Sequence, residues 1–456
     1  MAKVIVIGAG LVGSVMAMYL SRTGHEVDVY ERNGDPRGSK PKSKRSINIT
    51  LCKRGFTTLA ELGLDSVVRP YCVPAYARMV HFADGTTFRQ DYGNHNEALY
   101  TIARADLNRV LVDFAEEKFG VRFHFGQKCV DIDADGPSAT FEHAQSGTSF
   151  HIQGDVLFGA DGVNSSVRNC LQRQGLVVFD AQNWDQGYKE VNIPSGATGW
   201  LMEREVLHLW PRGEYMLIGF PNVGGDFTGS LHLPFRGKLS FESLRTETDL
   251  RRLFESSFPD VLPVARALFE NFFDRPVNRM TTIRCRPWNV QGKIILIGDA
   301  AHAIYPSYGQ GANAGFEDCR LLQSAMDHSK NWDEAFTQYE FFRRPNTDAI
   351  ADLCIEHFVE LRDRVADTNF QLRKQVERFV SDILPDSYMP LYFMISFTLI
   401  PYAEALEIER RQRGMIDRLM DVDDLRRKIQ AGTIVEDVVR LAKEYEQAGL
   451  LARCAI

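Results

Sequence analysis

The stretch that decides the fold lies at the N-terminus, where residues 3–31 read KVIVIGAGLVGSVMAMYLSRTGHEVDVYE. Its first five residues form a continuous, mostly β-branched run, which is typical of a strand buried on both faces. A glycine-rich turn then opens a helical pattern that runs through Arg22 and ends at Gly24, and residues 26–30 predict a second strand. The order strand, glycine turn, helix, strand predicts the βαβ unit of a Rossmann-like, dinucleotide-binding sheet.

Each glycine of this turn has a physical task. Gly8 permits the tight turn, Gly10 lets the backbone approach a pyrophosphate, and Gly13 allows the helix to pack closely on the strand. The N–H groups at the start of the helix can then bind the phosphate. Glu31 follows Gly13 by 18 residues, which suits a carboxylate that accepts hydrogen bonds from ribose hydroxyls. The motif alone leaves open whether the dinucleotide is NAD or FAD.

Composition excludes several classes of protein. The chain has 456 residues, 44% hydrophobic and 25% charged, which is ordinary for a globular protein of two or three units. Its 53 Lys and Arg against 60 Asp and Glu give a formal net charge of −7, so no basic excess favours nucleic-acid binding. The eight cysteines include no CxxC pair, so the sequence predicts neither a metal site nor a disulfide framework.

The chain carries no evident targeting or membrane segment. The N-terminus runs directly into the first strand, without the features of a signal peptide. The most membrane-like stretch, LYFMISFTLI at 391–400, is far shorter than the roughly 20 apolar residues that span a bilayer. We therefore expect a soluble, cytoplasmic protein without a membrane anchor, in which this stretch is buried.

Two later segments each place an acid directly after an apolar strand. Residues 155–168 read DVLFGADGVNSSVR, and residues 293–318 read KIILIGDAAHAIYPSYGQGANAGFED. Both resemble signatures of the single-component FAD-dependent aromatic hydroxylases, the p-hydroxybenzoate hydroxylase-like family. The resemblance implies FAD as the bound cofactor, with Asp299 on the ribityl chain and the following helix directed at the flavin pyrimidine. A helix N-terminus suits that place because reduced flavin is negatively charged there.

The resemblance also implies a set of cofactor contacts. Residue type alone leaves other roles open, because Asp299 could cap a helix and Arg45 and Arg104 could be surface arginines. The implied cofactor-binding residues are Gly8, Gly10, Val12, Gly13, Glu31, Arg32, Arg45, Arg104, Cys129, Asp161, Ser166, Asp299, Gly311, Ala312 and Asn313.

Segments outside the cofactor motifs narrow the resemblance to one branch of the family, the kynurenine 3-monooxygenases. The most specific are RSIN at 45–48 and HLWPR at 208–212, because the flavin fold itself does not require them. The resemblance implies that Arg78 and Tyr92 hold the substrate carboxylate, and a guanidinium fork with a phenol hydroxyl suits that group. The other implied substrate contacts are His357, Glu360, Tyr402, Ser307 and Tyr308.

Several positions depart from the pattern of that branch. His357 stands where the family has asparagine, and Ser307 and Tyr308 replace more aromatic or histidine-containing pairs. Ala312 replaces the usual methionine of the Gly-Gln-Gly loop. These departures cluster at the substrate end, so a substituted kynurenine or another tryptophan-derived aromatic acid remains open as the substrate.

The activity implied is an FAD-dependent, NADPH-consuming monooxygenase that converts L-kynurenine to 3-hydroxykynurenine through a C4a-hydroperoxyflavin formed with O2. The cofactor carries the chemistry, so no catalytic side chain is assigned. The aniline nitrogen of kynurenine activates the ring, and a base role is not predicted for His357. Without a second glycine motif, NADPH is expected to bind only transiently. Alternatives are another FAD enzyme, such as a dehydrogenase or a phenolic-acid hydroxylase, and a non-enzymatic binding protein on the same fold.

These predictions divide the chain into three units of an α/β protein. The Rossmann-like FAD-binding domain is expected to be discontinuous, at 1–72, 101–177 and 280–340. An inserted β-sheet domain, at 73–100 and 178–279, is expected to bind the substrate, with a hairpin turn at Asp84-Gly85. A helical region at 341–456 is expected to close the active site. The expected partner is a small aromatic amino acid, and a homodimer is left open.

Overall fold

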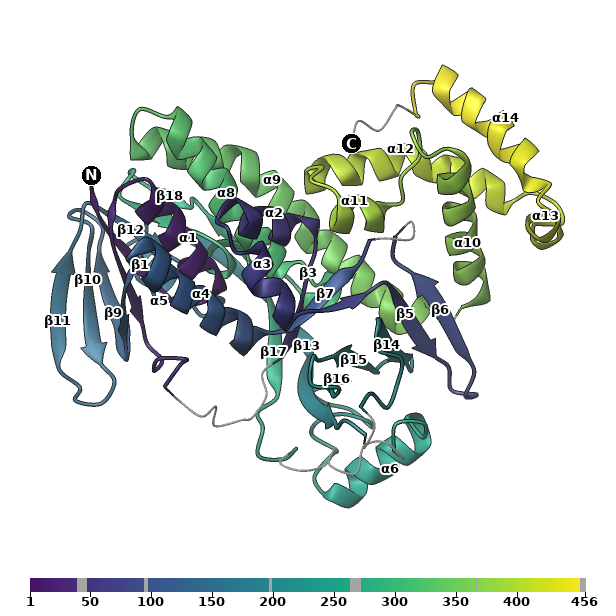
Figure 1. Cartoon of the computed structure of the whole chain (residues 1–456), viewed down its shortest axis with the longest axis horizontal. Helices are drawn as coiled ribbons and strands as arrows, with labels where there is room; N and C mark the ends of the chain where they lie inside the picture. Colours follow the sequence, from purple (N-terminus) through teal and green to yellow (C-terminus); the bar gives the residue numbers. More distant parts are fainter. Residues whose placement is uncertain (39–46, 94–96, 197–198, 263–271, 366, 452–456) are drawn as a thin grey trace.

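The computed structural model describes residues 1–38, 47–93, 97–196, 199–262, 272–365 and 367–451 (Figure 1). Arg45, a predicted cofactor contact, lies outside these residues. Within them, no helix combines the length and apolar character needed to cross a membrane. The same part of the chain contains no group of three His, Cys, Asp or Glu side chains that could hold a metal ion.

The N-terminal stretch forms the predicted βαβ unit, and a six-stranded sheet extends from it. β1 pairs in parallel with β2 on one side and with β12 on the other, and β19 pairs in parallel with β12. Strands far apart in sequence therefore end at one edge of the sheet. The sheet order is β18-β19-β12-β1-β2-β8. The bounds are β1 (Lys3–Ile7), β2 (Glu26–Glu31), β8 (Arg122–Phe125), β12 (Val156–Gly159), β18 (Asn289–Val290) and β19 (Ile294–Leu296).

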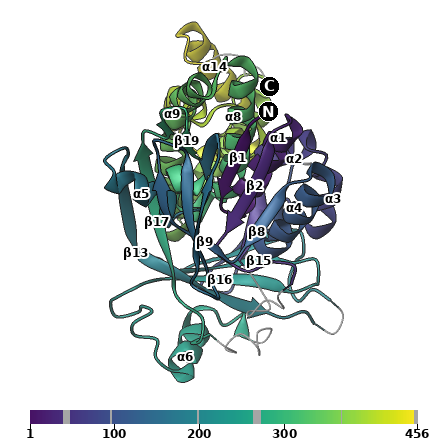
Figure 2. The same ribbon diagram turned by 90° about the vertical axis from the view of Figure 1, so that its left-hand side faces the viewer.

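Helices cover this sheet and complete its core. α1 packs against α4 and α8, and α8 also packs against α2 and α9. In Figure 2, α1 and α4 lie beside β1 and β2. The run from Val4 to Ile7 is buried, as its β-branched composition predicts. The helices are α1 (Leu11–Arg22), α2 (Lys53–Glu61), α3 (Asp65–Val68), α4 (Arg104–Phe119), α5 (Ser166–Arg173), α7 (Asp299–His302), α8 (Gly311–His328) and α9 (Trp332–Val359).

A seven-stranded sheet forms the second layer, in the order β17-β13-β16-β15-β14-β5-β6. The predicted turn at Asp84-Gly85 is confirmed, since it joins the antiparallel strands β5 and β6. Helix α6 (Glu247–Ser257) packs on the face of this sheet that carries Trp210 and Leu231. The strands are β5 (Ala77–His81), β6 (Thr87–Asp91), β13 (Val178–Ile193), β14 (Val206–Pro211), β15 (Met216–Pro221), β16 (Phe227–Pro234) and β17 (Asn278–Arg286).

Two small antiparallel sheets complete the β-structure. One has the order β11-β10-β9 and packs beside β2, and the other has the order β3-β7-β4. Their strands are β3 (Asn48–Leu51), β4 (Val73–Ala75), β7 (Leu99–Ala103), β9 (Gln127–Asp133), β10 (Ser138–His143) and β11 (Ser149–Gln153).

The C-terminal part is helical, as predicted, and has its own apolar core. α9 passes into a π-helical turn at Glu360–Arg364. Residues from α10, α12, α13 and α14 then share a core that includes Val376, Leu419 and Val438. The segment 391–400 is mostly the short helix α11, whose Met394 and Ile395 are buried. The helices are α10 (Thr368–Ile383), α11 (Leu391–Phe397), α12 (Tyr402–Met420), α13 (Leu425–Ala431) and α14 (Ile434–Gln447).

Three of the predicted domain boundaries fall inside continuous elements. The boundary at 101 lies in β7, which pairs with β3 and β4. The boundary at 280 lies in β17, which pairs with β13 of the seven-stranded sheet. The boundary at 340 lies in α9, which packs against α8 near its start and against α12 further along. α9 therefore joins the nucleotide-binding unit to the C-terminal helices as one continuous helix.

Candidate functional site

A cavity of about 800 Å3 runs from the carboxyl ends of β1, β2 and β12 to the seven-stranded sheet. Its size is in the range of cofactor and ligand pockets. One end is lined by the N-terminal glycine turn and by the acids that follow the strands. The other end is lined by aromatic and apolar side chains from the second sheet, α9 and α11. The two ends call for different ligands, a nucleotide and a small aromatic molecule.

The glycine turn has no room for side chains at Gly8 and Gly13, and it leaves open space for a phosphate at Gly10. Gly8 has a φ of +108°, and a Cβ atom there would lie 2.4 Å from the carbonyl oxygen of Ala160. A Cβ atom on Gly13 would lie 1.9 Å from the carbonyl oxygen of Gly8, so only glycine lets α1 pack this closely. Apart from its chain neighbours, no described residue has an atom within 4 Å of the Cβ position of Gly10, which faces the cavity.

Two carboxylates at the strand ends face the cavity. The carboxylate of Glu31 accepts hydrogen bonds from the backbone N–H groups of Ala9, at 3.0 Å, and Asn33, at 2.8 Å. In Asp161, Oδ2 accepts from Ser166 N at 2.6 Å, whereas the buried Oδ1 has no hydrogen-bond partner among the described residues. Burial raises the pKa of Asp161. A buried acceptor without a donor is costly, and a ligand hydroxyl would satisfy it.

The loops before α7 and α8 form the floor between the two ends of the cavity. Asp299, Gly311 and Ala312 line it, and the first N–H groups of α8 have no acceptor within the helix. Asn313 holds this loop from behind, because its side chain bonds to Cys52 N, Thr50 O and Gly309 O. The open glycine turn, the unpartnered Asp161 oxygen and the start of α8 together fit FAD.

Most of the predicted cofactor residues lie on the cavity surface. Gly13 and Asn313 do not, since the first packs α1 on β1 and the second fixes the α8 loop. Those lining the cavity are Gly8, Gly10, Val12, Glu31, Arg32, Arg104, Cys129, Asp161, Ser166, Asp299, Gly311 and Ala312.

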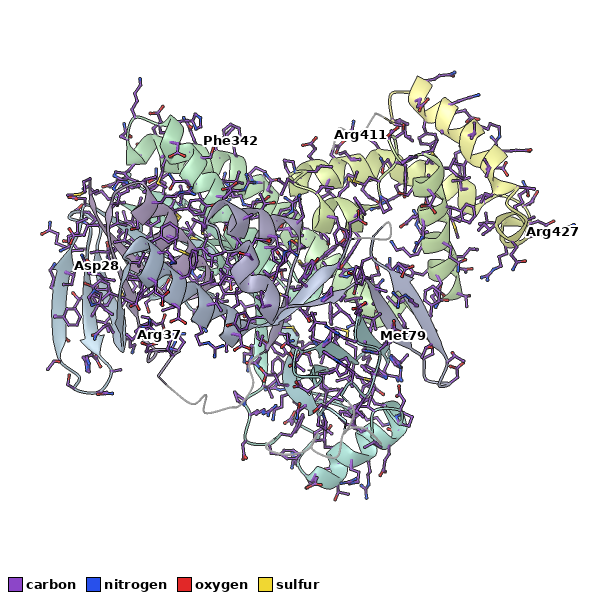
Figure 3. The ribbon with its side chains drawn as sticks, in the orientation of Figure 1. Asp28, Arg37, Met79, Phe342, Arg411 and Arg427 are labelled. Atoms are coloured by element: carbon purple, nitrogen blue, oxygen red, sulfur yellow. The ribbon has the colours of Figure 1, made fainter. Side chains whose placement is uncertain are left out.

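At the other end, Arg78 and Tyr92 lie close together. Arg78 belongs to β5, next to Met79 (labelled in Figure 3), and is only 5% exposed. Its Nε donates to Gln90 Oε1 at 2.9 Å, and its Nη2 lies 3.5 Å from Glu360 Oε1. Its Nη1 makes no hydrogen bond to any described residue and is available to a ligand. Burial raises the pKa of Tyr92 to about 12, so its hydroxyl keeps its proton.

An aromatic wall lies beside this pair. The ring of Tyr392 stacks on Tyr92 with centroids 5.3 Å apart and on Tyr308 with centroids 5.2 Å apart. The His357 ring lies 4.3 Å from that of Tyr308. Burial lowers the pKa of His357, which favours the neutral imidazole. Across the cavity, β14, β15 and β16 contribute an opposing surface of Leu207, Leu209, Met216, Ile218, Phe220 and His232.

Three of the predicted substrate residues have other contacts. Tyr402 is fully buried and does not line the cavity; its hydroxyl donates to Gln310 Oε1 at 2.9 Å and its ring packs on Arg54. The predicted substrate contact at Tyr402 therefore lies away from the cavity surface, because α12 begins at Tyr402 and its ring packs on Arg54 of α2. Glu360 lies behind the cavity, 3.5 Å from Arg78 and 3.7 Å from His357. Ser307 lines the cavity, but its hydroxyl donates to Cys354 O.

Tyr392 lines the cavity and is absent from the site residues that the sequence predicts. The segment Met389-Pro390-Leu391-Tyr392 is among those that resemble the kynurenine 3-monooxygenases, yet Tyr402, ten residues later, was assigned the contact. Both tyrosines lie in the first turn of a helix that follows a proline, so local pattern does not separate them. Only the packing of α11 against the cavity distinguishes Tyr392 from Tyr402.

Comparison with known proteins gives a consistent picture. The family model described as "FAD binding domain" matches residues 1–215 and 243–352. The kynurenine 3-monooxygenase of Flavobacterium johnsoniae is 40% identical over 93% of this chain and 95% of its own length. That of Myxococcus xanthus is 38% identical over 92% of this chain and 90% of its own length.

Solved structures with the same fold are more distant in sequence. A tetrameric form of 2-methyl-3-hydroxypyridine-5-carboxylic acid oxygenase has a TM-score of 0.64 at 22% identity, covering 82% of this chain and 95% of the other. Klebsiella pneumoniae HpxO complexed with FAD and uric acid has a TM-score of 0.63 at 23% identity, covering 81% of this chain and 90% of the other. At these identities the likeness concerns the fold.

Proposed function

Because this chain belongs to the kynurenine 3-monooxygenase family of flavoproteins and is an FAD-dependent monooxygenase, we propose that its substrate is L-kynurenine. The proposed reaction consumes kynurenine, O2, NADPH and a proton, and gives 3-hydroxykynurenine, NADP+ and water. The new hydroxyl group is placed on the ring carbon next to the amino group. The relatives named above are called kynurenine 3-monooxygenases, and the residues at the cavity support the same substrate here.

The observation that carries the proposal is the pair Arg78 and Tyr92 at the aromatic end of the cavity. Arg78 has a free Nη1 that faces no described acceptor, and Tyr92 keeps its hydroxyl proton. Two donors of this kind suit the carboxylate of an amino acid. Glu360, 3.5 Å from Arg78, holds the guanidinium in place from behind. We propose that the amino-acid end of the substrate binds here, which directs the aromatic ring toward the α8 loop.

The remaining residues bind, orient and exclude water. Bound FAD supplies the redox chemistry, accepting a hydride from NADPH and activating O2 for transfer of one oxygen atom. We propose that Glu31 and Asp161 accept hydrogen bonds from cofactor hydroxyls. The N–H groups at the start of α8 would stabilise negative charge on the reduced flavin. The stacked rings of Tyr92, Tyr392 and Tyr308 keep the substrate end dry.

No side chain has to act as a strong base in this proposal. The amino group of kynurenine already activates the neighbouring ring carbon. The neutral His357, which lines the cavity beside Tyr308, can donate or accept one hydrogen bond to the substrate. This position also favours a second candidate, a kynurenine with a polar ring substituent that bonds to the imidazole.

The test is NADPH oxidation by the FAD-loaded protein with and without L-kynurenine, together with mass analysis of the product. We expect faster oxidation with kynurenine and a product that gains one oxygen atom. Removing the charged donor with Arg78→Met should raise the KM for kynurenine about 30- to 100-fold, as expected for one lost hydrogen bond to a charged group. FAD content should stay unchanged, because Arg78 lies at the opposite end of the cavity.

The matched control is Arg89→Met, an arginine on the neighbouring strand β6 that pairs with Asp91 at the surface. This variant should behave like the wild type. If the wild type oxidises NADPH but returns kynurenine unchanged and releases peroxide, the substrate is the substituted kynurenine or another aromatic acid. If Arg78→Met binds kynurenine as tightly as the wild type, the carboxylate assignment is wrong.

A further inference from the structure

Four charged side chains form a continuous chain in the interior, between α2, α8 and α9. Arg54 Nη1 lies 2.6 Å from Glu317 Oε1, and the other oxygen of Glu317 lies 2.7 Å from Arg343 Nη1. Arg343 Nε in turn lies 2.6 Å from Asp318 Oδ1. All four residues are at most 3% exposed. We refer to Arg54, Glu317, Arg343 and Asp318 as the buried ion chain.

One end of the buried ion chain reaches α11. Arg54 Nε donates to the carbonyl oxygen of Ile395 at 3.1 Å, and its Nη2 donates to that of Ile400. Ile395 lies in the last turn of α11, and Ile400 lies in the connection to α12. The last carbonyl groups of a helix have no N–H donor within the helix, so Arg54 supplies one. A positive charge is also favourable at a helix C-terminus. Arg54 therefore fixes the end of the helix whose first turn carries Tyr392.

The other end reaches the loops that line the flavin end of the cavity. Asp318 Oδ2 accepts from the N–H of Gly298, the residue before Asp299, at 3.2 Å. Arg343 Nη2 donates to Ala314 O in the first turn of α8 at 3.0 Å. Tyr402 provides a second link, since its ring lies 4.1 Å from the Arg54 guanidinium and its hydroxyl donates to Gln310. The substrate wall and the flavin loops are therefore held by one set of charges.

Stability alone is a poor reason for this arrangement. Burying charges costs free energy of solvation, and well-packed apolar residues often give equal or greater stability. A planar guanidinium with several donors does provide direction, because it fixes each acceptor at a defined angle.

We propose that Arg54 is a positioning residue: through its bonds to Ile395 and Ile400 it sets Tyr392 against the substrate, and through Glu317 it ties that placement to the α8 loop. The part that concerns substrate binding rests on the proposed function; the placement of α11 does not.

The first test needs no substrate and compares hydrogen exchange in FAD-loaded wild type and Arg54→Lys. Lysine keeps the charge beside Glu317, but one ammonium group cannot reach both carbonyls and the carboxylate as the fork does. We expect at least tenfold faster exchange of amides in residues 391–401, with exchange of α1 unchanged. The matched control is Arg69→Lys, since Arg69 is an exposed arginine after α3 that pairs with Asp65. This control should change exchange neither in residues 391–401 nor in α1. Unchanged exchange in 391–401, or faster exchange throughout the molecule, would overturn the proposal.

The second test measures the Kd of L-kynurenine from the perturbation of the flavin absorbance. Arg54→Lys should raise the Kd about tenfold while FAD content stays at the wild-type level. In a Tyr392→Ala background the same substitution should have no further effect, because its influence passes through Tyr392. An equal effect in both backgrounds would contradict that route. If the wild type does not bind kynurenine, the proposed function is wrong, but the exchange experiment still tests the placement of α11.

Should Arg54→Lys fail to fold, exchange of residues 391–401 is compared in Glu317→Gln, which leaves Arg54 in place but removes the charge that orients it, with the same expected and contradicting results. Tyr402→Phe tests the second link, through Gln310, by itself. It keeps the ring on Arg54 and removes only the bond to Gln310. We expect a kynurenine Kd two- to fivefold higher than in the wild type, with a melting temperature only a few degrees lower, as the loss of one buried hydrogen bond of about 1 kcal/mol implies. A Kd equal to that of the wild type would remove Tyr402 and its link from the proposal.

Discussion

Two glycines in the first turn, three residues apart, meet opposite requirements. Gly13 has no room for a side chain, because a Cβ atom there would lie 1.9 Å from the backbone oxygen of Gly8. Gly10 has open space on the cavity side, so its missing side chain matters only when a ligand is present. Packing of α1 requires glycine at position 13, whereas at position 10 we propose that glycine is required by the bound cofactor.

Substituting each glycine by alanine separates these roles. Gly10→Ala should fold with a wild-type melting temperature in the absence of FAD and bind FAD at least tenfold more weakly. Gly13→Ala should lower the free energy of unfolding by about 3 kcal/mol, because backbone must move to relieve the clash. Thermal unfolding of the apoprotein and FAD content from visible absorbance give the two readouts. A Gly10→Ala variant with full FAD affinity would show that the backbone does not approach the pyrophosphate there.

The two tyrosines after prolines, Tyr392 and Tyr402, show the limit of sequence reasoning at this scale. Resemblance placed a substrate contact in the C-terminal region, and the cavity has a tyrosine there, but it is Tyr392. The ring of Tyr402 instead packs on the guanidinium of Arg54. Which ring reaches a cavity depends on how α11 and α12 pack against α2, and neither helix carries a local signal for that.

Among the elements, the parallel pairing of β5 with β14 places two histidines side by side. His208 Nε2 donates to the carbonyl oxygen of Glu203 at 2.9 Å, so its Nδ1 must accept from His81 Nε2, also at 2.9 Å. His81 Nδ1 lies 3.0 Å from Asp260, which also accepts from Trp210. These bonds place a proton on His208 Nε2 and leave its Nδ1 as an acceptor, so they require a neutral His208.

This arrangement predicts a loss of stability in mild acid. Burial lowers the pKa of His208 from the ordinary 6.5 to about 4. Between these pH values, His208 binds a proton in the unfolded chain but not in the folded protein. The contribution of His208 to the free energy of unfolding is therefore complete above pH 6.5 and decreases as the pH falls toward 4. At pH 5 the loss is about 2 kcal/mol. Urea unfolding at pH 7 and pH 5 measures it.

His208→Gln is the comparison for that experiment, because glutamine offers a donor and an acceptor but does not titrate in this range. The decrease in unfolding free energy between pH 7 and pH 5 should be about 2 kcal/mol smaller in the variant. Equal decreases in the two proteins would mean that His208 takes up its proton in the folded state.

Across the whole molecule, the two ends of the cavity differ in how far the sequence predicts them. The nucleotide end is built from contiguous motifs, in which strand, turn and helix follow one another within thirty residues, so local pattern is sufficient. The substrate end collects Arg78 from β5, His357 from α9, Tyr392 from α11 and an apolar surface from β14, β15 and β16. No periodicity or spacing relates these segments, and family resemblance supplied what was predicted there.

The C-terminal helices have a separate apolar core, which predicts that its disruption affects substrate binding but not FAD binding. Val438 on α14 is fully buried in that core, whereas its neighbour Val439 is 37% exposed. Val438→Asp places an unpaired charge in the core, which costs several kcal/mol, and should loosen α10 and α12. Because the cofactor residues belong to the other core, FAD content should stay at the wild-type level while the KM for substrate rises. Val439→Asp should change neither quantity. If Val438→Asp releases FAD as readily as it weakens substrate binding, the two cores unfold as one unit and the C-terminal helices support the whole molecule rather than the substrate end.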